Sequence, residues 1–68
     1  MISYRKFFDL LKTRGINITQ LRRDNAVTQS ALTAMRQNRH INLKTVDRLC
    51  EYLKCQPGDI MEYEKEEQ

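Results

Sequence analysis

Two stretches of the chain, one near each end, carry apolar residues at the spacing i, i+3, i+4, i+7. This spacing puts four side chains on one face of an α-helix, whereas the side chains of a strand alternate between two faces. The chain has 68 residues with only two glycines and one proline, too few for the frequent turns of an all-β domain. We therefore predict one compact all-α domain. The two apolar sets are Tyr4, Phe7, Phe8 and Leu11, and Val46, Leu49, Cys50 and Leu53.

Capping residues predict where the helices of the first half begin and end. Ser3 is expected to cap a first helix over about residues 3–15, and Gly15 to end it after two basic residues. Thr19 is expected to cap a short second helix over about residues 20–25. Ala26 and Val27 then form the turn to the third helix.

Capping residues also predict the helix ends in the second half of the chain. Thr28 is expected to cap a third helix that runs to about Gln37, and Asn38 to end it in the left-handed conformation. Asn42 is expected to cap the fourth helix, and Pro57 to open a short fifth helical turn. The pattern is therefore a bundle of four helices and a short fifth. The expected inward residues of these segments are Leu21, Leu32, Met35, Ile60 and Tyr63.

Charge is distributed unevenly along the chain. Residues 1–58 hold eleven Lys and Arg against four Asp and Glu, whereas residues 59–68 hold one Lys against five Asp and Glu. A basic body suggests a polyanionic partner, although small domains also carry such charge for solubility. We predict a domain over residues 1–63 and an acidic tail over residues 64–68.

Metal, redox and membrane chemistry find little support in the sequence. On one helix, Cys50 and Cys55 would lie about 140° apart, so they should neither bridge nor share a metal. The single histidine, His40, has no partner ligands, and there is no nucleophile–base pair or glycine-rich phosphate loop. We expect no cofactor, metal, small-molecule ligand or enzymatic activity. With no signal peptide or long apolar run, we expect a cytoplasmic protein that does not contact membranes.

The second and third helices are too short to be stable alone, and only a few residues separate them. Such a pair, packed on longer helices, is a helix-turn-helix whose second helix can enter a DNA major groove. The stretch of residues 26–42 contains no carboxylate, which fits a surface that meets phosphate. Its outward side chains are short hydrogen-bonding or methyl groups, which suit base edges. We predict base reading by Gln29, Ser30, Thr33, Ala34 and Gln37.

Phosphate contacts are expected around this face. The amide groups at the start of the third helix form an anion site near Thr28, and basic or amide side chains flank both ends. Polar outward residues are usually only solvated, but here a neutral face, flanking bases and a short helix pair occur together. Arg36 could pair with Asp24 or contact DNA. The expected phosphate-binding residues are Thr28, Asn38, Arg39, Lys44, Arg22, Arg23 and Arg14.

The stretch "ITQLRRDNAVTQSALTAMRQN" resembles the helix-turn-helix of lambda-repressor-like regulators, the Cro/CI-type or XRE family. The following "INLKTVDRLCEYLKCQPGDIMEY" is similar to a small single-domain subgroup of that family. Ala26 stands where many relatives have glycine, and Asn38 replaces a frequent glycine after the third helix. The resemblance implies a lambda repressor-like fold, with Gln29, Ser30 and Thr33 matching the base-reading positions.

The resemblance further implies a bacterial or phage transcriptional regulator, most simply a repressor, that binds double-stranded DNA. A homodimer on a palindromic operator is the expected form. The alternative is a protein-interaction module of the same fold, an antitoxin or anti-repressor, whose acidic tail docks to a basic partner or shields its own DNA face.

Overall fold

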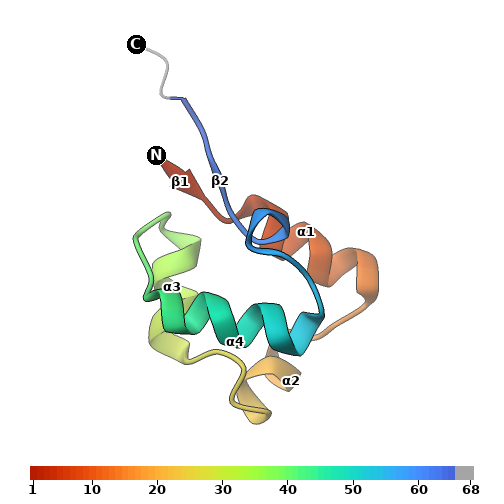
Figure 1. Cartoon of the computed structure of the whole chain (residues 1–68). Coiled ribbons are helices and arrows are strands. Elements are labelled where there is room, and N and C mark those ends of the chain that lie inside the picture. Colours follow the sequence, from red (N-terminus) through yellow and green to blue (C-terminus); the bar gives the residue numbers. More distant parts are fainter. Residues whose placement is uncertain (66–68) are drawn as a thin grey trace.

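The structure, a computed structural model, describes residues 1–65 as four α-helices, one 3-10 turn and a small antiparallel sheet (Figure 1). The predicted helical bundle with a short fifth helical turn is confirmed. Of the predicted acidic tail, residues 66–68 lie outside the described residues. The elements in chain order are β1 (Ile2–Ser3), α1 (Arg5–Arg14), α2 (Ile18–Arg23), α3 (Gln29–Arg36), α4 (Leu43–Leu53), the 3-10 turn η1 (Pro57–Asp59) and β2 (Glu62–Tyr63).

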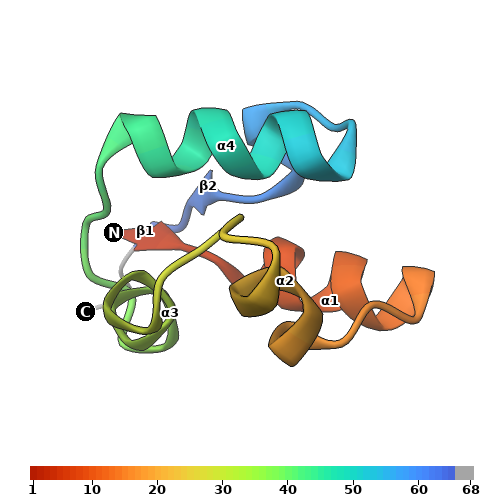
Figure 2. The ribbon, with the colours of Figure 1, turned by 90° about the horizontal axis from the view of Figure 1, so that it is seen from below.

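Helix α4 forms one layer, and α1, α2 and α3 form the other (Figure 2). Helix α3 lies across the N-terminal end of α4, while α1 extends toward the C-terminal end of α4 (Figures 1 and 2). Apolar side chains from both layers meet between them, as expected for amphipathic helices that cannot bury their faces alone. No helix within residues 1–65 is long and apolar enough to span a membrane. The buried core comprises Tyr4, Phe7, Leu11, Leu21, Ala26, Val27, Leu32, Met35, Val46, Leu49, Leu53 and Ile60.

The caps predicted for the third and fourth helices are confirmed. The Thr28 hydroxyl accepts a hydrogen bond from the Ala31 amide at 3.1 Å, and α3 begins there. The Asn42 side chain accepts from the Lys44 amide at 2.8 Å at the start of α4. Asn38 has the predicted left-handed conformation, with φ of 55°. Thr28 thus fixes the start of α3, and Asn38 and Asn42 lie at the two ends of the loop between α3 and α4.

Two predicted caps are wrong. Helix α2 begins at Ile18, and Asn17 caps it by accepting from the Thr19 amide at 2.8 Å. Asn17 precedes Ile18, whose side chain packs against the core, so the helix starts earlier than Thr19 suggests. Ser3 lies in β1 instead of capping α1, whose N-cap is Tyr4 with no side-chain cap bond. The Ser3 hydroxyl still accepts from the Arg5 amide at 3.3 Å.

A two-stranded sheet, which the sequence did not predict, joins residues 2–3 to residues 62–63. Strands β1 and β2 pair antiparallel, with Ile2 opposite Tyr63 and Ser3 opposite Glu62. In addition, the Met1 ammonium group donates to the Glu64 carbonyl oxygen at 2.7 Å. The prediction that Tyr63 closes the core is wrong, because Tyr63 lies on this strand and is 72% exposed.

The predicted separation of the two cysteines is also wrong. Helix α4 ends at Leu53, and Lys54 turns the chain back in the left-handed conformation, with φ of 54°. The Cys55 amide then donates to the Cys50 carbonyl oxygen at 3.1 Å. Cys55 is therefore outside the helix and adjacent to Cys50. Cys50, which belongs to the predicted apolar face of this helix, is only half-buried.

Candidate nucleic-acid interface

Helix α3 separates its apolar and polar residues onto two faces. Leu32 and Met35 are almost completely buried and attach the helix to the core. Four of the five residues predicted to read bases are exposed, and Ala34 is half-buried. The outer face of α3 therefore presents short polar side chains on a firmly packed helix. The exposed members of the predicted set are Gln29, Ser30, Thr33 and Gln37.

Two of these outer side chains are hydrogen-bonded to each other. The Gln29 amide nitrogen donates to the Thr33 hydroxyl at 3.3 Å, one helical turn farther along. Because the two residues are exposed, this bond limits their rotamers without removing them from the surface. The Gln29 carbonyl oxygen and its second amide hydrogen are left for other groups. The pair offers a donor and an acceptor in a defined direction.

Basic side chains gather at the N-terminal end of α3. Arg22 from α2 and Arg48 from α4 line the same surface hollow as Thr28 and Gln29. The N-terminus of a helix carries partial positive charge, so two guanidinium groups beside it make the region more electropositive. The sequence pointed to Arg22 but missed Arg48. Nothing in the sequence shows that α4 crosses the start of α3 at this residue.

The other flank of α3 faces the loop that leads into α4. Ser30 and Ala34 line a small groove together with His40, Asn42 and Thr45. His40 and Asn42 are exposed, so this groove continues the polar face of α3 toward the first turn of α4. Lys44, also exposed, lies in that same turn. Lys44 therefore lies one residue from Thr45, which lines this groove, and its contact with phosphate stays a prediction.

A buried tyrosine holds the loop after α3. The Tyr4 hydroxyl donates to the Arg39 carbonyl oxygen at 2.7 Å, while the Arg39 side chain remains exposed. Burial raises the pKa of the Tyr4 hydroxyl above its usual value, so this donor keeps its proton. Residues Asn38 and Arg39 are therefore presented by a loop whose backbone is tied to the first helix.

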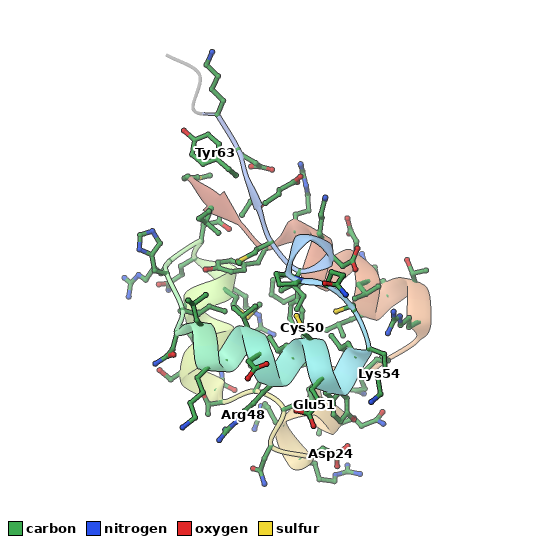
Figure 3. The ribbon with its side chains drawn as sticks, in the orientation of Figure 1. Asp24, Arg48, Cys50, Glu51, Lys54 and Tyr63 are labelled. Carbon is green, nitrogen blue, oxygen red and sulfur yellow. The ribbon has the colours of Figure 1, made fainter. Side chains whose placement is uncertain are left out.

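The joint between α2 and α3 is tied to α4. The Tyr52 hydroxyl donates to the Asp24 carboxylate at 2.6 Å, and this bond is the main cause that raises the pKa of Tyr52. Asn25 follows in the left-handed conformation, with φ of 59°, which makes the turn without a glycine. Asp24 therefore pairs with Tyr52 and not with Arg36, which lines a surface hollow together with Asp9 of α1. Figure 3 shows Asp24 on the same side of α4 as Arg48.

The two remaining residues predicted to bind phosphate, Arg23 and Arg14, lie in different parts of the molecule. Arg23 is exposed in the last turn of α2. Arg14 lies at the end of α1, away from α3, and its guanidinium donates to the Leu53 carbonyl oxygen at the end of α4. The structure does not bring Arg14 together with the other predicted residues. Within residues 1–65, no group of three His, Cys, Asp or Glu residues is placed to hold a metal ion.

Comparisons with known proteins agree with this geometry. The family model of the Cro/C1-type HTH DNA-binding domain matches residues 8–66. The chain is 33% identical over 60 residues to an uncharacterized HTH-type transcriptional regulator, YozG of Bacillus subtilis (strain 168), covering 85% of this chain and 71% of the relative. It is also similar to the crystal structure of the transcriptional regulator VanUg, with a TM-score of 0.81 and 34% identity over 90% of this chain and 81% of that one.

Proposed function

Because this chain belongs to the Cro/C1-type helix-turn-helix DNA-binding family, we propose that it is a sequence-specific transcriptional regulator that inserts α3 into the major groove. The observation that carries this proposal is the outer face of α3, which is exposed, hydrogen-bonding and free of carboxylates. A major groove admits one α-helix, and short side chains let the helix approach the bases closely. We infer repression as the sense of regulation, because a protein bound over a promoter excludes the polymerase.

Base reading is assigned to the outer face of α3. Gln29 is the principal residue, since a glutamine amide can pair bidentately with adenine, and its bond to Thr33 limits its rotamers. Ser30 and Thr33 donate or accept at neighbouring base edges, and the Ala34 methyl group can contact a thymine methyl group. Gln37 extends the face toward the C-terminal end of the helix.

Phosphate binding is assigned to the two flanks of α3. On the first flank, Arg22 and Arg48 stand beside the N-terminal end of α3, where Thr28 also lies, and Arg23 extends this basic rim. On the second flank, Asn38, Arg39 and Lys44 follow the helix. Two basic flanks around the neutral outer face of α3 match the two DNA backbones of a groove. Contacts to these backbones set affinity and register, while contacts to the bases set sequence. Arg14 is left out of this set, because its guanidinium is bonded to α4.

We further infer that the regulator binds as a homodimer on a palindromic operator. Helix-turn-helix dimers place two recognition helices one DNA turn apart, with half-sites separated by about 34 Å. A selection of bound duplexes from random DNA tests both inferences at once. It should return a palindrome, and a reporter gene placed behind that operator should be repressed. Recovery of a single half-site would contradict the dimer, and recovery of no enriched sequence would contradict sequence-specific binding.

Salt dependence tests the phosphate contacts. With roughly three to five contacts per protomer, the binding constant should fall with salt at a log–log slope of about −0.9 per contact. The slope is measured by fluorescence anisotropy on the selected duplex at several salt concentrations. Binding that does not depend on salt, or binding to no duplex, would contradict the proposal and favour a protein-interaction module.

A pair of variants separates the two roles. Gln29→Ala should lose about 1–3 kcal/mol on the preferred site and accept other bases at one position. Arg39→Ala should weaken binding to all duplexes nearly equally and reduce the salt slope by about one contact. Lys12→Ala is the matched control, because it removes the same charge from the last turn of α1, away from α3. If the first two variants behave alike, the assignment of roles is wrong.

A further inference from the structure

The two cysteines meet at the C-terminal end of α4, away from the residues assigned to DNA. Lys54 ends the helix in the left-handed conformation, and the Cys55 amide donates to the Cys50 carbonyl oxygen at 3.1 Å. This bond defines a Schellman turn, in which these two positions commonly make a side-chain contact. The backbone of this turn therefore keeps Cys50 and Cys55 next to each other.

The two cysteines are partly buried, yet they line a groove that is open at the surface. Both are free thiols, both are half-buried, and both pack against the apolar core. They line one surface groove with Val46 and Pro57, so a small oxidant can reach them. Burial, and then the adjacent Cys50, raises the pKa of the Cys55 thiol. Cys50 and Cys55 thus lie together in a site open to small molecules.

We propose that Cys50 and Cys55 are a peroxide-oxidisable thiol pair that forms a reversible disulfide. A disulfide requires Cα atoms about 4.4–6.8 Å apart. The hydrogen bond from the Cys55 amide to the Cys50 carbonyl oxygen holds the two residues next to each other. The bond would link the last turn of α4 to the segment that leads into η1. The Schellman turn already brings the two main chains together at this point.

The reaction proceeds in two displacements. One thiol loses its proton and attacks a peroxide oxygen as the thiolate, the S–O bond forms and the O–O bond breaks. The released hydroxide takes up the proton and leaves as water, and a sulfenic acid remains. The second thiol then attacks the sulfenic sulfur, the S–S bond forms and the S–O bond breaks. The hydroxyl group takes the proton of the attacking thiol and leaves as a second water. The two sulfurs together lose two electrons and two protons, and hydrogen peroxide gains them. A dithiol reductant reverses the change by thiol–disulfide exchange.

The expected consequence is a more stable fold with unchanged DNA binding. A cross-link over this short loop restricts the unfolded chain, so the oxidised protein should melt at a higher temperature than the reduced one. Figure 3 shows Cys50 on the opposite side of α4 from Arg48, which flanks the proposed DNA interface. The oxidation itself does not depend on the proposed regulatory function.

The test uses the full chain, reduced and then treated with hydrogen peroxide at low protein concentration. Remaining thiols are blocked with N-ethylmaleimide, and the intact mass is measured. We expect a monomer that has lost two hydrogen atoms and takes up no maleimide, and that recovers two maleimide groups after treatment with dithiothreitol. Two maleimide groups after oxidation, or cross-linked dimers as the main product, would overturn the proposal.

A melting experiment supplies the second readout. Oxidised wild-type protein should melt above reduced wild-type protein, whereas a Cys50→Ala/Cys55→Ala variant should melt at one temperature with or without peroxide. Alanine is chosen because it keeps a small apolar side chain at these half-buried positions. A lower melting temperature for the oxidised wild-type protein would show that the turn does not accommodate the bond. The mass measurement on wild-type protein remains decisive if the variant fails to fold.

Discussion

At the start of α3, one hydroxyl group satisfies an amide that the helix itself leaves without a partner. Thr28 accepts from the Ala31 amide at 3.1 Å, so replacing it with alanine removes the cap without changing the core. Thr28→Ala should lower the free energy of unfolding by about 0.5–2 kcal/mol, measured by urea denaturation. Thr28→Ser, which keeps the hydroxyl, is the control and should lose much less. Equal losses in the two variants would mean that the cap is not the cause.

The Tyr4 hydroxyl also donates a hydrogen bond to the main chain, at a residue 35 positions away in the sequence. Its bond to the Arg39 carbonyl oxygen ties the loop after α3 to α1, while its ring fills the core. Tyr4→Phe keeps the ring and should lower the free energy of unfolding by about 0.5–1.5 kcal/mol. Amide hydrogen exchange should become faster in the loop between α3 and α4. Unchanged exchange there would contradict a role of Tyr4 in holding this loop.

The same residue makes stability sensitive to alkaline pH. Burial raises the pKa of Tyr4 above the ordinary value of 10.0, so the folded protein keeps this proton longer than the unfolded chain does. The stabilising contribution is complete below about pH 10 and is lost as pH rises through the raised pKa. Urea denaturation from pH 8 upward should show this loss, and Tyr4→Phe should show a shallower decline. Parallel profiles for the two proteins would contradict the prediction.

Among the elements, the joint between α2 and α3 depends on a contact from α4. Tyr52 donates to Asp24, the residue that ends α2, at 2.6 Å. Tyr52→Phe should loosen this joint and increase amide exchange in α2 and at the start of α3, with a weaker binding constant for DNA. Tyr63→Phe is the matched control, because Tyr63 is an exposed tyrosine on β2. If both variants exchange alike, the Asp24 contact does not position the joint.

Elements with a strong periodic pattern were predictable, and elements without one were not. The core faces of α1 and α4 follow from their i, i+3, i+4, i+7 spacing, and Thr28 and Asn42 cap where expected. Strands β1 and β2 have only two residues each, too few to show a period, and they form because distant segments meet. Two nearby candidates also mislead: Asn17 and Thr19 can both cap, and in the structure Asn17 does so.

The candidate site was predictable where it lies on one helix. The exposed positions of Gln29, Ser30 and Thr33 follow from the helical spacing of Leu32 and Met35. Contributions from other elements depend on how helices cross, and the sequence does not contain that information locally. Arg48 was missed for this reason. Arg14 was predicted near DNA, yet it lies at the far end of α1.

For the whole molecule, charge pairing joins the last described residues to α1. Arg5 contacts the Glu64 carboxylate at 2.8 Å, and Lys6 contacts the Glu62 carboxylate at 3.5 Å. Arg5 and Lys6 are exposed and the two glutamates are half-buried, so water still screens these pairs. Glu62→Gln/Glu64→Gln should therefore lower the free energy of unfolding by less than about 1 kcal/mol. The difference should disappear in high salt, where exposed charges are screened. A loss that persists in high salt would show that packing, not charge, links these segments.

The pairing of β1 with β2 has a consequence for the order of folding. The Met1 ammonium group and the Glu64 carbonyl oxygen that it contacts are 63 positions apart in the chain, so almost the whole polypeptide must form a loop before they meet. Each helix instead closes hydrogen bonds over a few residues, and such local contacts form first. Strands β1 and β2 should therefore come together last during folding and separate first during unfolding. A fusion attached to Met1 would remove its free ammonium group and open this end of the molecule earlier still.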